Sequence, residues 1–350
     1  MFGDRFELLA SNLTASAIIA NMPQTMRSYW IHAEADRTLL ERREVAVPDP
    51  APGQVLVRMR AAGLNRGEFM AAFGLHAKAG APRPAGAEGA GEVAKLGAGV
   101  EQLSVGERVM GRCAGAFAEY AIMDAREAIA IPPRLTWEAA AAVPLTFTTV
   151  HDMLIAQGRL AAGEWLLVTG ISSGVGVAAL ATAKVLGARV IGTSGSAEKL
   201  EKLGALGLDV GLRTRSADFC EAVMQATGGR GANLVVNNVG GSVFAECVRA
   251  LAFEGRFATV GYVDGVMKSE IDIEALHTRR LTLFGVSNKL RNAEQRAGTV
   301  RGFVADLLPA IADGRIRPVI DRRFDFEELP AAKAYMESNA HLGKIVLRVA

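Results

Sequence analysis

The spacing of apolar and polar positions changes near Trp165 and divides the chain into two kinds of pattern. From residue 26 to about residue 130, short apolar runs alternate with glycine and proline. Runs of this kind predict β-strands, of which 54–60, 91–95 and 107–110 are the clearest. The first part of the chain is therefore expected to be rich in β-structure.

From Trp165 onward, continuous apolar runs alternate with stretches of helical character. An apolar run of about five residues is typical of a parallel strand that is buried on both faces. The predicted strands are 165–169, 189–193, 233–237 and 256–260, and the predicted helices between them are 175–186, 199–206 and 244–251. Alternation of this type predicts a doubly wound parallel sheet.

After about residue 288 the mixed pattern returns, and the chain closes with a predicted strand, 344–349. The fold class is therefore α/β, with one split domain that carries an inserted dinucleotide-type domain. We place the split domain at 26–148 and 289–350, and the inserted domain at 149–288. Residues 1–25 are interpreted as an N-terminal extension, or as a start placed upstream of Met26, rather than a signal peptide, because no basic segment precedes the apolar stretch.

Composition excludes several classes of function. The 350 residues carry 39 basic and 37 acidic side chains, a formal net charge of +2, so nothing favours nucleic-acid binding. No apolar run of about 18 residues predicts a membrane span. The three cysteines, Cys113, Cys220 and Cys247, form no CxxC pair, which argues against a disulfide framework and suits the reducing cytoplasm.

A glycine-rich turn follows the strand 165–169 and leads into the helix 175–186. Glycine at such a turn lets the backbone approach a pyrophosphate, and the helix start offers free N–H groups. The spacing differs from GxGxxG, and a tight turn without a ligand is the alternative interpretation. The candidate cofactor-binding residues here are Gly170, Ser172, Ser173, Gly174, Val175 and Gly176.

The end of the next strand indicates which dinucleotide is bound. An NAD site requires a carboxylate there for the ribose 2′-hydroxyl, but residues 190–196 contain none. Hydroxyl groups and cations suit a 2′-phosphate instead, which predicts NADP(H). The candidates are Ser194, Ser196, Lys199, Arg213 and Arg215, although Lys199 also fits a solvated helix position.

Seven motifs, taken in order, resemble one family. They are Ala61-Ala62-Gly63-Leu64-Asn65, Gly86-Ala87-Glu88-Gly89-Ala90-Gly91-Glu92-Val93, Val105-Gly106-Glu107-Arg108-Val109, Gly115-Ala116-Phe117-Ala118-Glu119-Tyr120, Val143-Pro144-Leu145-Thr146-Phe147-Thr148-Thr149, the phosphate loop with Val239-Gly240-Gly241, and Gly343-Lys344-Ile345-Val346-Leu347. In this order they resemble the zinc-independent medium-chain dehydrogenases/reductases, in particular the quinone oxidoreductase branch that includes zeta-crystallin.

The resemblance runs from about Met26 to the C-terminus and implies an architecture. It implies a GroES-like β-barrel catalytic domain around an inserted Rossmann domain, with the active site in the cleft between them. It also implies a homodimer that forms through edge strands of the Rossmann sheets, for which 281–286 is the candidate edge.

The resemblance also implies that no metal takes part. Zinc-dependent relatives carry a cysteine where this chain has Asn65, and Gly-His-Glu where it has Gly86-Ala87-Glu88. A catalytic zinc needs about three ligands from cysteine, histidine or carboxylate side chains. We therefore expect no metal site, whatever the superfamily label.

By resemblance, Asn65 lies near the nicotinamide and the substrate. Its amide would donate a hydrogen bond to an oxygen that gains negative charge, the alternative being a turn residue that bonds its own backbone. Many relatives have a tyrosine where this chain has His76, which could donate a proton or be an ordinary loop residue. The family's aspartate is Glu68 here, and both departures leave the substrate preference open.

Further residues are expected to line the cofactor because they match family positions or follow strands of the parallel sheet. The alternatives are a helix-start hydroxyl for Thr149 and a plain turn for the glycine pair at 240–241. The remaining candidates are Thr149, Asn238, Val239, Gly240, Gly261, Tyr262 and Ser287.

These observations predict a cytoplasmic NADPH-dependent reductase of quinones or α,β-unsaturated carbonyl compounds, with a small-molecule substrate. An enoyl-thioester reductase of the same superfamily is a close alternative. A different class, an NADPH-binding structural or RNA-binding protein with little turnover, is disfavoured by the balanced charge.

Overall fold

The computed structural model describes residues 22–34, 37–70 and 81–349. The chain folds as two compact units. Unit 1 comprises Met1–Leu145, Arg322–Ala340 and Ile345–Ala350, and unit 2 comprises Thr146–Asp321 and His341–Lys344.

Unit 1 is built mainly from strands, as its short apolar runs predict. Its elements are β1 (Thr25–Glu34), β2 (Arg37–Ala46), β3 (Gln54–Gly63), η1 (Arg66–Glu68), β4 (Arg83–Pro84), β5 (Glu88–Leu96), β6 (Arg108–Ala114), β7 (Tyr120–Ala130), α2 (Trp137–Ala141), β14 (Ile320–Asp325), η4 (Phe326–Glu328), α11 (Leu329–Glu337) and β15 (Lys344–Arg348). One sheet has the order β2-β1-β4, and the other has the order β14-β15-β3-β5-β6-β7. An additional pairing between β3 and β7 closes β3, β5, β6 and β7 into a barrel.

Unit 2 is the alternating α/β part of the chain. Its elements are α3 (Pro144–Val150), the π-helix η2 (His151–Ala156), β8 (Trp165–Thr169), α4 (Gly174–Val185), β9 (Arg189–Ser194), α5 (Ala197–Ala205), β10 (Val210–Arg213), α6 (Cys220–Ala226), β11 (Ala232–Asn237), η3 (Gly241–Val243), α7 (Phe244–Arg249), β12 (Leu251–Thr259), α8 (Ile273–Thr278), β13 (Thr282–Gly285), α9 (Ala293–Asp306) and α10 (Leu308–Ala312).

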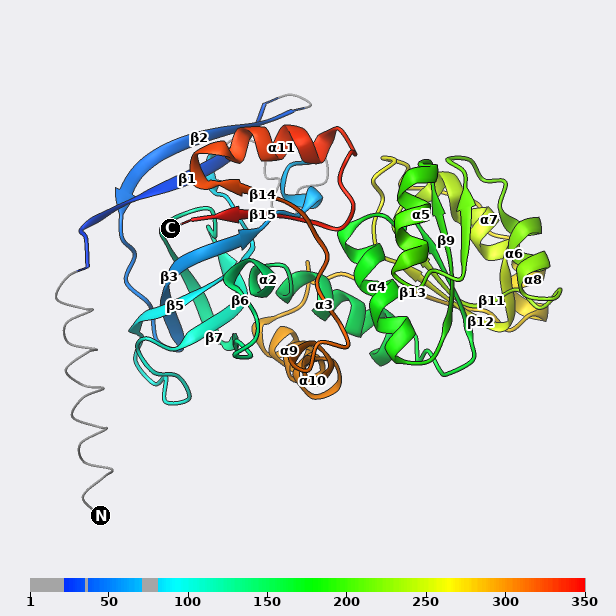
Figure 1. Cartoon of the computed structure of the whole chain (residues 1–350), viewed down its shortest axis with the longest axis horizontal. Helices are drawn as coiled ribbons and strands as arrows, with labels where there is room; N and C mark the ends of the chain where they lie inside the picture. The colour runs from blue at the N-terminus through cyan, green and yellow to red at the C-terminus, as the bar shows by residue number, and fades with distance from the viewer. Residues whose placement is uncertain (1–21, 35–36, 71–80, 350) are drawn as a thin grey trace, which may run out of the picture. The chain divides into compact units, whose positions relative to one another are not determined.

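The sheet of unit 2 confirms the predicted doubly wound fold. Its strands run in the order β10-β9-β8-β11-β12-β13, and neighbouring strands are parallel. Helices α4 and α5 cover one face, and α6, α7 and α8 cover the other (Figure 1). In this strand order the direction of winding reverses between β8 and β11, and ligands bind beyond the carboxyl ends of the strands at such a point.

Two predicted boundaries differ from the structure. The helix predicted to reach residue 251 ends at Arg249, and β12 begins at Leu251, well before the predicted strand start at residue 256. A register shift interrupts the pairing of β12 with β11, and Glu254 adopts a positive φ of 56° there. The polar Glu254-Gly255-Arg256 segment breaks the apolar pattern, so the strand looked shorter than it is.

Residues 289–321, which we placed with the barrel domain, group with unit 2. Ion pairs explain this. His151 Nε2 lies 2.8 Å from Asp306 Oδ2 at the end of α9, and Arg291 donates to the Asp152 carboxylate at 3.0 Å just before α9 begins. The neighbouring residues His151 and Asp152 are both buried, and together they hold the two ends of α9 on η2.

Candidate functional site

The predicted phosphate loop forms the turn from β8 into α4. Gly170 has a φ of 62°, and its N–H donates to the Thr193 hydroxyl at 3.2 Å. Ser173 is the N-cap of α4 and accepts a hydrogen bond from the Gly176 N–H at 3.1 Å. The first N–H groups of a helix have no partner within the helix, and they carry the positive end of its dipole. The loop therefore presents donors suited to a phosphate.

Gly176 brings α4 close to the preceding loop. A Cβ at this position would lie 2.5 Å from the Ile171 carbonyl oxygen, a backbone atom that cannot rotate away. Helix α4 can approach β8 this closely only because residue 176 lacks a side chain. Gly176 thus fixes where the helix start presents its N–H groups.

Replacing Gly176 by alanine is expected to lower the free energy of unfolding by about 2 kcal/mol, because the helix must move away from the loop. Gly204 in α5 is the matched control, since nothing lies within 4 Å of a Cβ placed there. Gly204→Ala should be neutral or stabilise the protein by up to about 1 kcal/mol, through better helix propensity. Urea unfolding of both variants measures the difference, and equal stability of the two would contradict this assignment.

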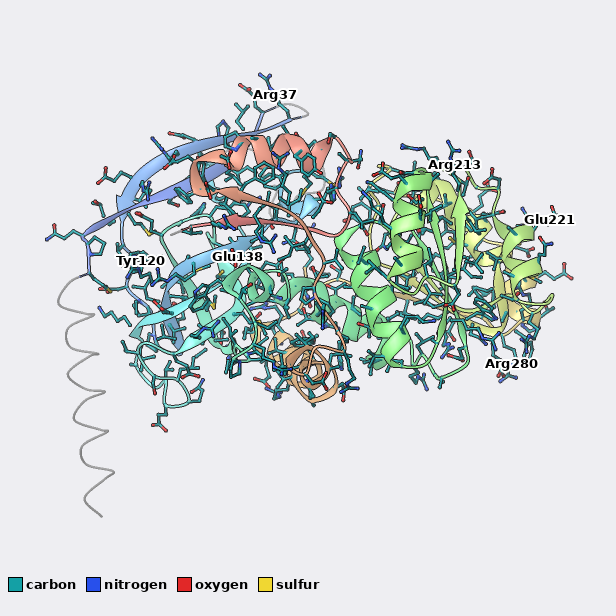
Figure 2. The ribbon with its side chains drawn as sticks, in the orientation of Figure 1. Arg37, Tyr120, Glu138, Arg213, Glu221 and Arg280 are labelled. Carbon is teal, nitrogen blue, oxygen red and sulfur yellow. The ribbon has the colours of Figure 1, made fainter. Side chains whose placement is uncertain are left out.

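The carboxyl ends of β9 and β10 bring hydroxyl groups and arginines together. Arg213 pairs in register with Ser194, and the Arg215 side chain lies over Gly195, where an added Cβ would be 2.1 Å from its Nε. Neither guanidinium forms an ion pair or hydrogen bond with another described residue. Figure 2 labels Arg213 at this end of unit 2. The structure thus places Ser194, Ser196 and both arginines in one region, without a carboxylate in contact with the two cations.

Lys199 has a partner that the sequence did not indicate. Its Nζ donates to the carbonyl oxygen of His341 at 2.7 Å, and its own N–H donates to the Ser196 hydroxyl, which caps α5. The ammonium group therefore helps to hold the C-terminal segment of unit 2. Its predicted contact with a 2′-phosphate stays a prediction.

Asn237, which no sequence motif singled out, organises the loop after β11. Its Oδ1 accepts hydrogen bonds from the Thr169 hydroxyl and from the N–H groups of Val239 and Gly240, at 3.0 to 3.1 Å. Its Nδ2 donates to the Gly240 carbonyl at 2.8 Å. The predicted residues Asn238, Val239 and Gly240 are thereby fixed beside the end of β8.

The loop after β12 packs against this loop. Gly261 lies close to the Asn238 carbonyl, 3.1 Å from where its Cβ would be. Gly240, with a φ of 133°, faces the Asp264 carboxylate, which accepts hydrogen bonds from Ser242 and the Val266 N–H. Burial opposes ionisation of Asp264, but these hydrogen bonds outweigh it and lower its pKa. Glycine at 240 and 261 therefore allows close contact between the two loops.

The other predicted cofactor residues lie in less distinctive surroundings. Thr149 is half-buried on α3, and Tyr262 is 38% exposed. The Ser287 hydroxyl accepts a hydrogen bond from the Lys289 N–H, as in an ordinary polar turn. Their contacts with a cofactor stay predictions.

Lys344 is a second residue of unit 2 that the sequence analysis did not single out. It is 5% exposed, and its side-chain stem lies beside the start of α4, 2.8 Å from where a Cβ of Gly174 would be. Its neighbour Gly343 donates its N–H to the Ser172 carbonyl at 3.0 Å. The only sequence signal was the closing motif at 343–347, which gives no hint of this proximity.

In unit 1, Asn65 lies at the end of β3 and begins η1. Its Nδ2 is 2.9 Å from Glu68 Oε1 and 2.9 Å from Glu88 Oε1. Its side chain does not cap η1. An amide nitrogen has two N–H groups, and carboxylates accept but do not donate, so both hydrogens of Asn65 point at these carboxylates.

Glu88 is the centre of this cluster. It is completely buried, and its second oxygen accepts a hydrogen bond from the Leu145 N–H at 2.8 Å, in the first turn of α3. A carboxylate at a helix start is favoured by the helix dipole. One buried side chain therefore holds both Asn65 and Leu145, within unit 1.

His76, the second predicted catalytic residue, lies outside the described residues.

Burial raises the pKa of the Cys113 thiol, and the charges of Glu88 and Glu68 raise it further. Cys113 is therefore a protonated thiol at neutral pH rather than a reactive thiolate.

The described residues contain no group of three histidine, cysteine or acidic side chains that could hold a metal ion. The resemblance places zinc ligands of other relatives where this chain has Asn65 and Ala87, and the Asn65 amide nitrogen faces carboxylates. These residues do not fit a zinc site.

None of the helices in the described ranges has the length and apolar character needed to cross a membrane.

Comparison with known proteins places both units in one family. Residues 51–133 match the family described as alcohol dehydrogenase GroES-like domain, and residues 174–298 match zinc-binding dehydrogenase. The chain belongs to the medium-chain dehydrogenase/reductase family, with a GroES-like domain and a Rossmann-type sheet. The resemblance found in the sequence is thereby confirmed.

Solved structures and curated relatives agree with this assignment. A mycobacterial protein complexed with NADPH aligns with a TM-score of 0.83 and 26% identity, over 93% of this chain and 100% of the other. The CurK enoyl reductase aligns with a TM-score of 0.80 and 25% identity, over 94% and 100%. The spectinabilin polyketide synthase system protein NorB of Streptomyces orinoci is 35% identical over 335 residues, 93% of this chain. The chain spans only 15% of the length of that relative.

Proposed function

We propose that the chain catalyses NADPH-dependent reduction of an α,β-unsaturated carbonyl compound or a quinone, without a metal ion. The observation that carries this proposal is the pair of arginines, Arg213 and Arg215, beside Ser194 and Ser196 at the end of β9 and β10. A cationic, hydroxyl-rich region without a contacting carboxylate favours a 2′-phosphate over a free 2′-hydroxyl. The similar mycobacterial structure in complex with NADPH supports the same cofactor.

The residues that would hold NADPH follow from the geometry of unit 2. The helix start from Ser173 to Gly176 would bind the pyrophosphate. Residues 238–240, held by Asn237, would support the nicotinamide half together with Gly261, Tyr262, Thr149 and Ser287. When bound, NADPH supplies the hydride.

On the substrate side, the chain would bind and orient the acceptor beside the Asn65 cluster. Because both amide hydrogens of Asn65 bond carboxylates, donation to a substrate oxygen would require one of these bonds to be exchanged. Glu88 would hold Asn65 in place while it also accepts the hydrogen bond of the Leu145 N–H.

An enoyl thioester is the acceptor that the comparisons favour within this class. Polyketide synthases are among the curated relatives, at 35% identity, and an enoyl reductase is among the similar structures. A mycobacterial quinone oxidoreductase of 26% identity supports the quinone alternative. Enones, enoyl thioesters and quinones share an electron-poor carbon conjugated to an oxygen that gains negative charge.

A steady-state assay tests the proposed function. NADPH oxidation is followed with a linear enone, an enoyl thioester, a benzoquinone and a naphthoquinone, each repeated with NADH, on protein treated with a chelator. Turnover with NADPH on at least one acceptor, and little with NADH, is expected. Failure of every acceptor, or loss of turnover on metal removal, would argue against the proposal.

We also propose that two copies of the chain associate through β13. This strand ends the sheet, with β12 as its neighbour, and an edge strand offers unpaired backbone groups to a second chain. Light scattering of the purified protein is expected to give twice the chain mass. A monomer at micromolar concentration would contradict the association.

A further inference from the structure

Among the half-buried arginines of unit 1, Arg83 is the one without a hydrogen bond or ion pair in the described part of the chain. Its guanidinium makes no hydrogen bond or ion pair with the described residues, although the side chain is half-buried. The remaining half-buried arginines of the unit each contact an acceptor or a carboxylate, namely Arg43, Arg60, Arg66, Arg108 and Arg112. A partly buried cation that forms no hydrogen bond or ion pair loses hydration without a direct contact in return.

The backbone explains why Arg83 is turned inward. Strand β4 is antiparallel to β1, and Arg83 lies directly opposite Ile31. Residues opposite each other in an antiparallel pair project from the same face of the sheet. Ile31 is 2% exposed and belongs to the core of unit 1, so Arg83 projects from the core-facing side of the sheet.

Arg83 also lies within electrostatic range of the Asn65 cluster. Burial lowers the pKa of its guanidinium, and the charge of Glu68 acts in the opposite direction. An arginine remains protonated in a protein despite such shifts. Glu68 is itself the residue whose Oε1 accepts a hydrogen bond from Asn65.

The cluster needs a donor for the reaction proposed above. Hydride addition to an enone, enoyl thioester or quinone carbon places negative charge on the conjugated oxygen. Asn65 has both amide hydrogens on carboxylates, and the carboxylates of Glu68 and Glu88 would repel that charge. A preorganised donor that faces the developing charge stabilises the transition state more than the ground state.

We propose that Arg83 donates hydrogen bonds to the substrate oxygen that gains negative charge, and so acts as a catalytic residue of the reduction. This inference rests on the proposed function. The hydride adds to the electron-poor carbon, the electron pair of the carbon–carbon π bond moves toward the carbonyl, and the oxygen becomes an enolate or quinolate. The planar guanidinium, with several N–H groups, would receive this oxygen, and solvent would then supply the proton that completes the reduction.

The kinetic test uses Arg83→Gln and Arg83→Lys with an uncharged enone or quinone that the wild-type protein reduces; kcat is measured at saturating NADPH, and the KM for NADPH by varying its concentration. Arg83→Gln is expected to lower kcat about 100-fold, while the KM for NADPH stays within about threefold. Arg83→Lys keeps the charge but loses the planar guanidinium, so its kcat should lie between those of the wild type and Arg83→Gln. Arg134→Gln is the matched control, because Arg134 is an exposed arginine of the same unit, and it should retain wild-type kcat.

A binding test separates this inference from the proposed function. 4-Nitrophenolate mimics an oxygen that carries negative charge, and its absorbance reports its ionisation. The wild-type protein with NADP⁺ is expected to bind it at least about tenfold more tightly than Arg83→Gln, while Arg134→Gln binds like the wild type. Equal binding by wild type and Arg83→Gln, no binding by either, or an unchanged kcat in both Arg83 variants would overturn the assignment. Absence of wild-type turnover on every acceptor, with the expected difference in nitrophenolate binding, would instead count against the proposed function alone.

Discussion

Replacing Glu88 by alanine is expected to lower the free energy of unfolding by about 3–5 kcal/mol. The side chain is completely buried, and its removal leaves the Leu145 N–H and one Asn65 N–H without their acceptor. Each buried donor that loses its partner costs about 1–3 kcal/mol, and the vacated volume adds to this. Glu88→Gln retains one acceptor oxygen and should lie between the wild type and Glu88→Ala.

Glu92 on the same strand provides the matched control. Its side chain is 34% exposed, and its carboxylate pairs with Arg60 at 2.9 Å. Pairs that are this exposed contribute at most about 1 kcal/mol, so Glu92→Ala should have a small effect. Urea unfolding at neutral pH gives both values. If Glu88→Ala were no less stable than Glu92→Ala, the buried cluster would not have the structural role described above.

The double variant Arg213→Ser/Arg215→Ser is expected to raise the KM for NADPH about 100-fold and to leave kcat/KM with NADH within about threefold. A hydrogen bond to a charged group contributes about 1.5–3 kcal/mol, roughly tenfold in affinity or more for each arginine. NADH lacks the 2′-phosphate, so its binding should not depend on these arginines. The preference for NADPH should therefore fall with little change in the chemistry.

Arg301→Ser/Arg315→Ser is the control for this variant. Both residues are exposed arginines of unit 2 that pair with acidic neighbours, and the control removes the same total charge. It should behave like the wild type with both cofactors. If kcat/KM fell equally with NADPH and with NADH in the Arg213/Arg215 variant, these arginines would stabilise the fold rather than bind the 2′-phosphate.

The sequence predicted the framework of unit 2 well because buried parallel strands leave a simple signal. Strand β8 begins at Trp165 and ends at Thr169, as the continuous apolar run predicts. The ends of β12 were less predictable, since a register shift and the positive φ of Glu254 interrupt the pattern. The place of α9 was not predictable either, because His151 and Asp306 pair across 155 positions.

The candidate site likewise has features that the sequence predicts and features that appear only in the fold. The resemblance predicted Asn65 as a site residue, but it did not predict the direction of the Asn65 amide. That direction depends on two carboxylates that come together only in the fold, one of them 23 positions away. Arg83 belongs to no motif, and its lack of a hydrogen bond to the described residues is visible only once their side chains are placed. Asn237 was missed because its hydrogen bonds lie mainly with backbone groups of the next loop.

The most direct test of the account is the fate of the hydride in a single turnover. NADPH carrying deuterium at C4, prepared separately for each face of the ring, is mixed with metal-free protein and the preferred enone, enoyl thioester or quinone. For an enone or thioester, we expect one deuterium on the β-carbon of the product from one of the two labelled cofactors, at a rate that matches kcat or exceeds it. For a quinone, where a transferred deuteron can exchange with water, we expect a deuterium isotope effect on NADPH oxidation with the same single face. NADPH that binds but transfers no label and shows no isotope effect would contradict the account.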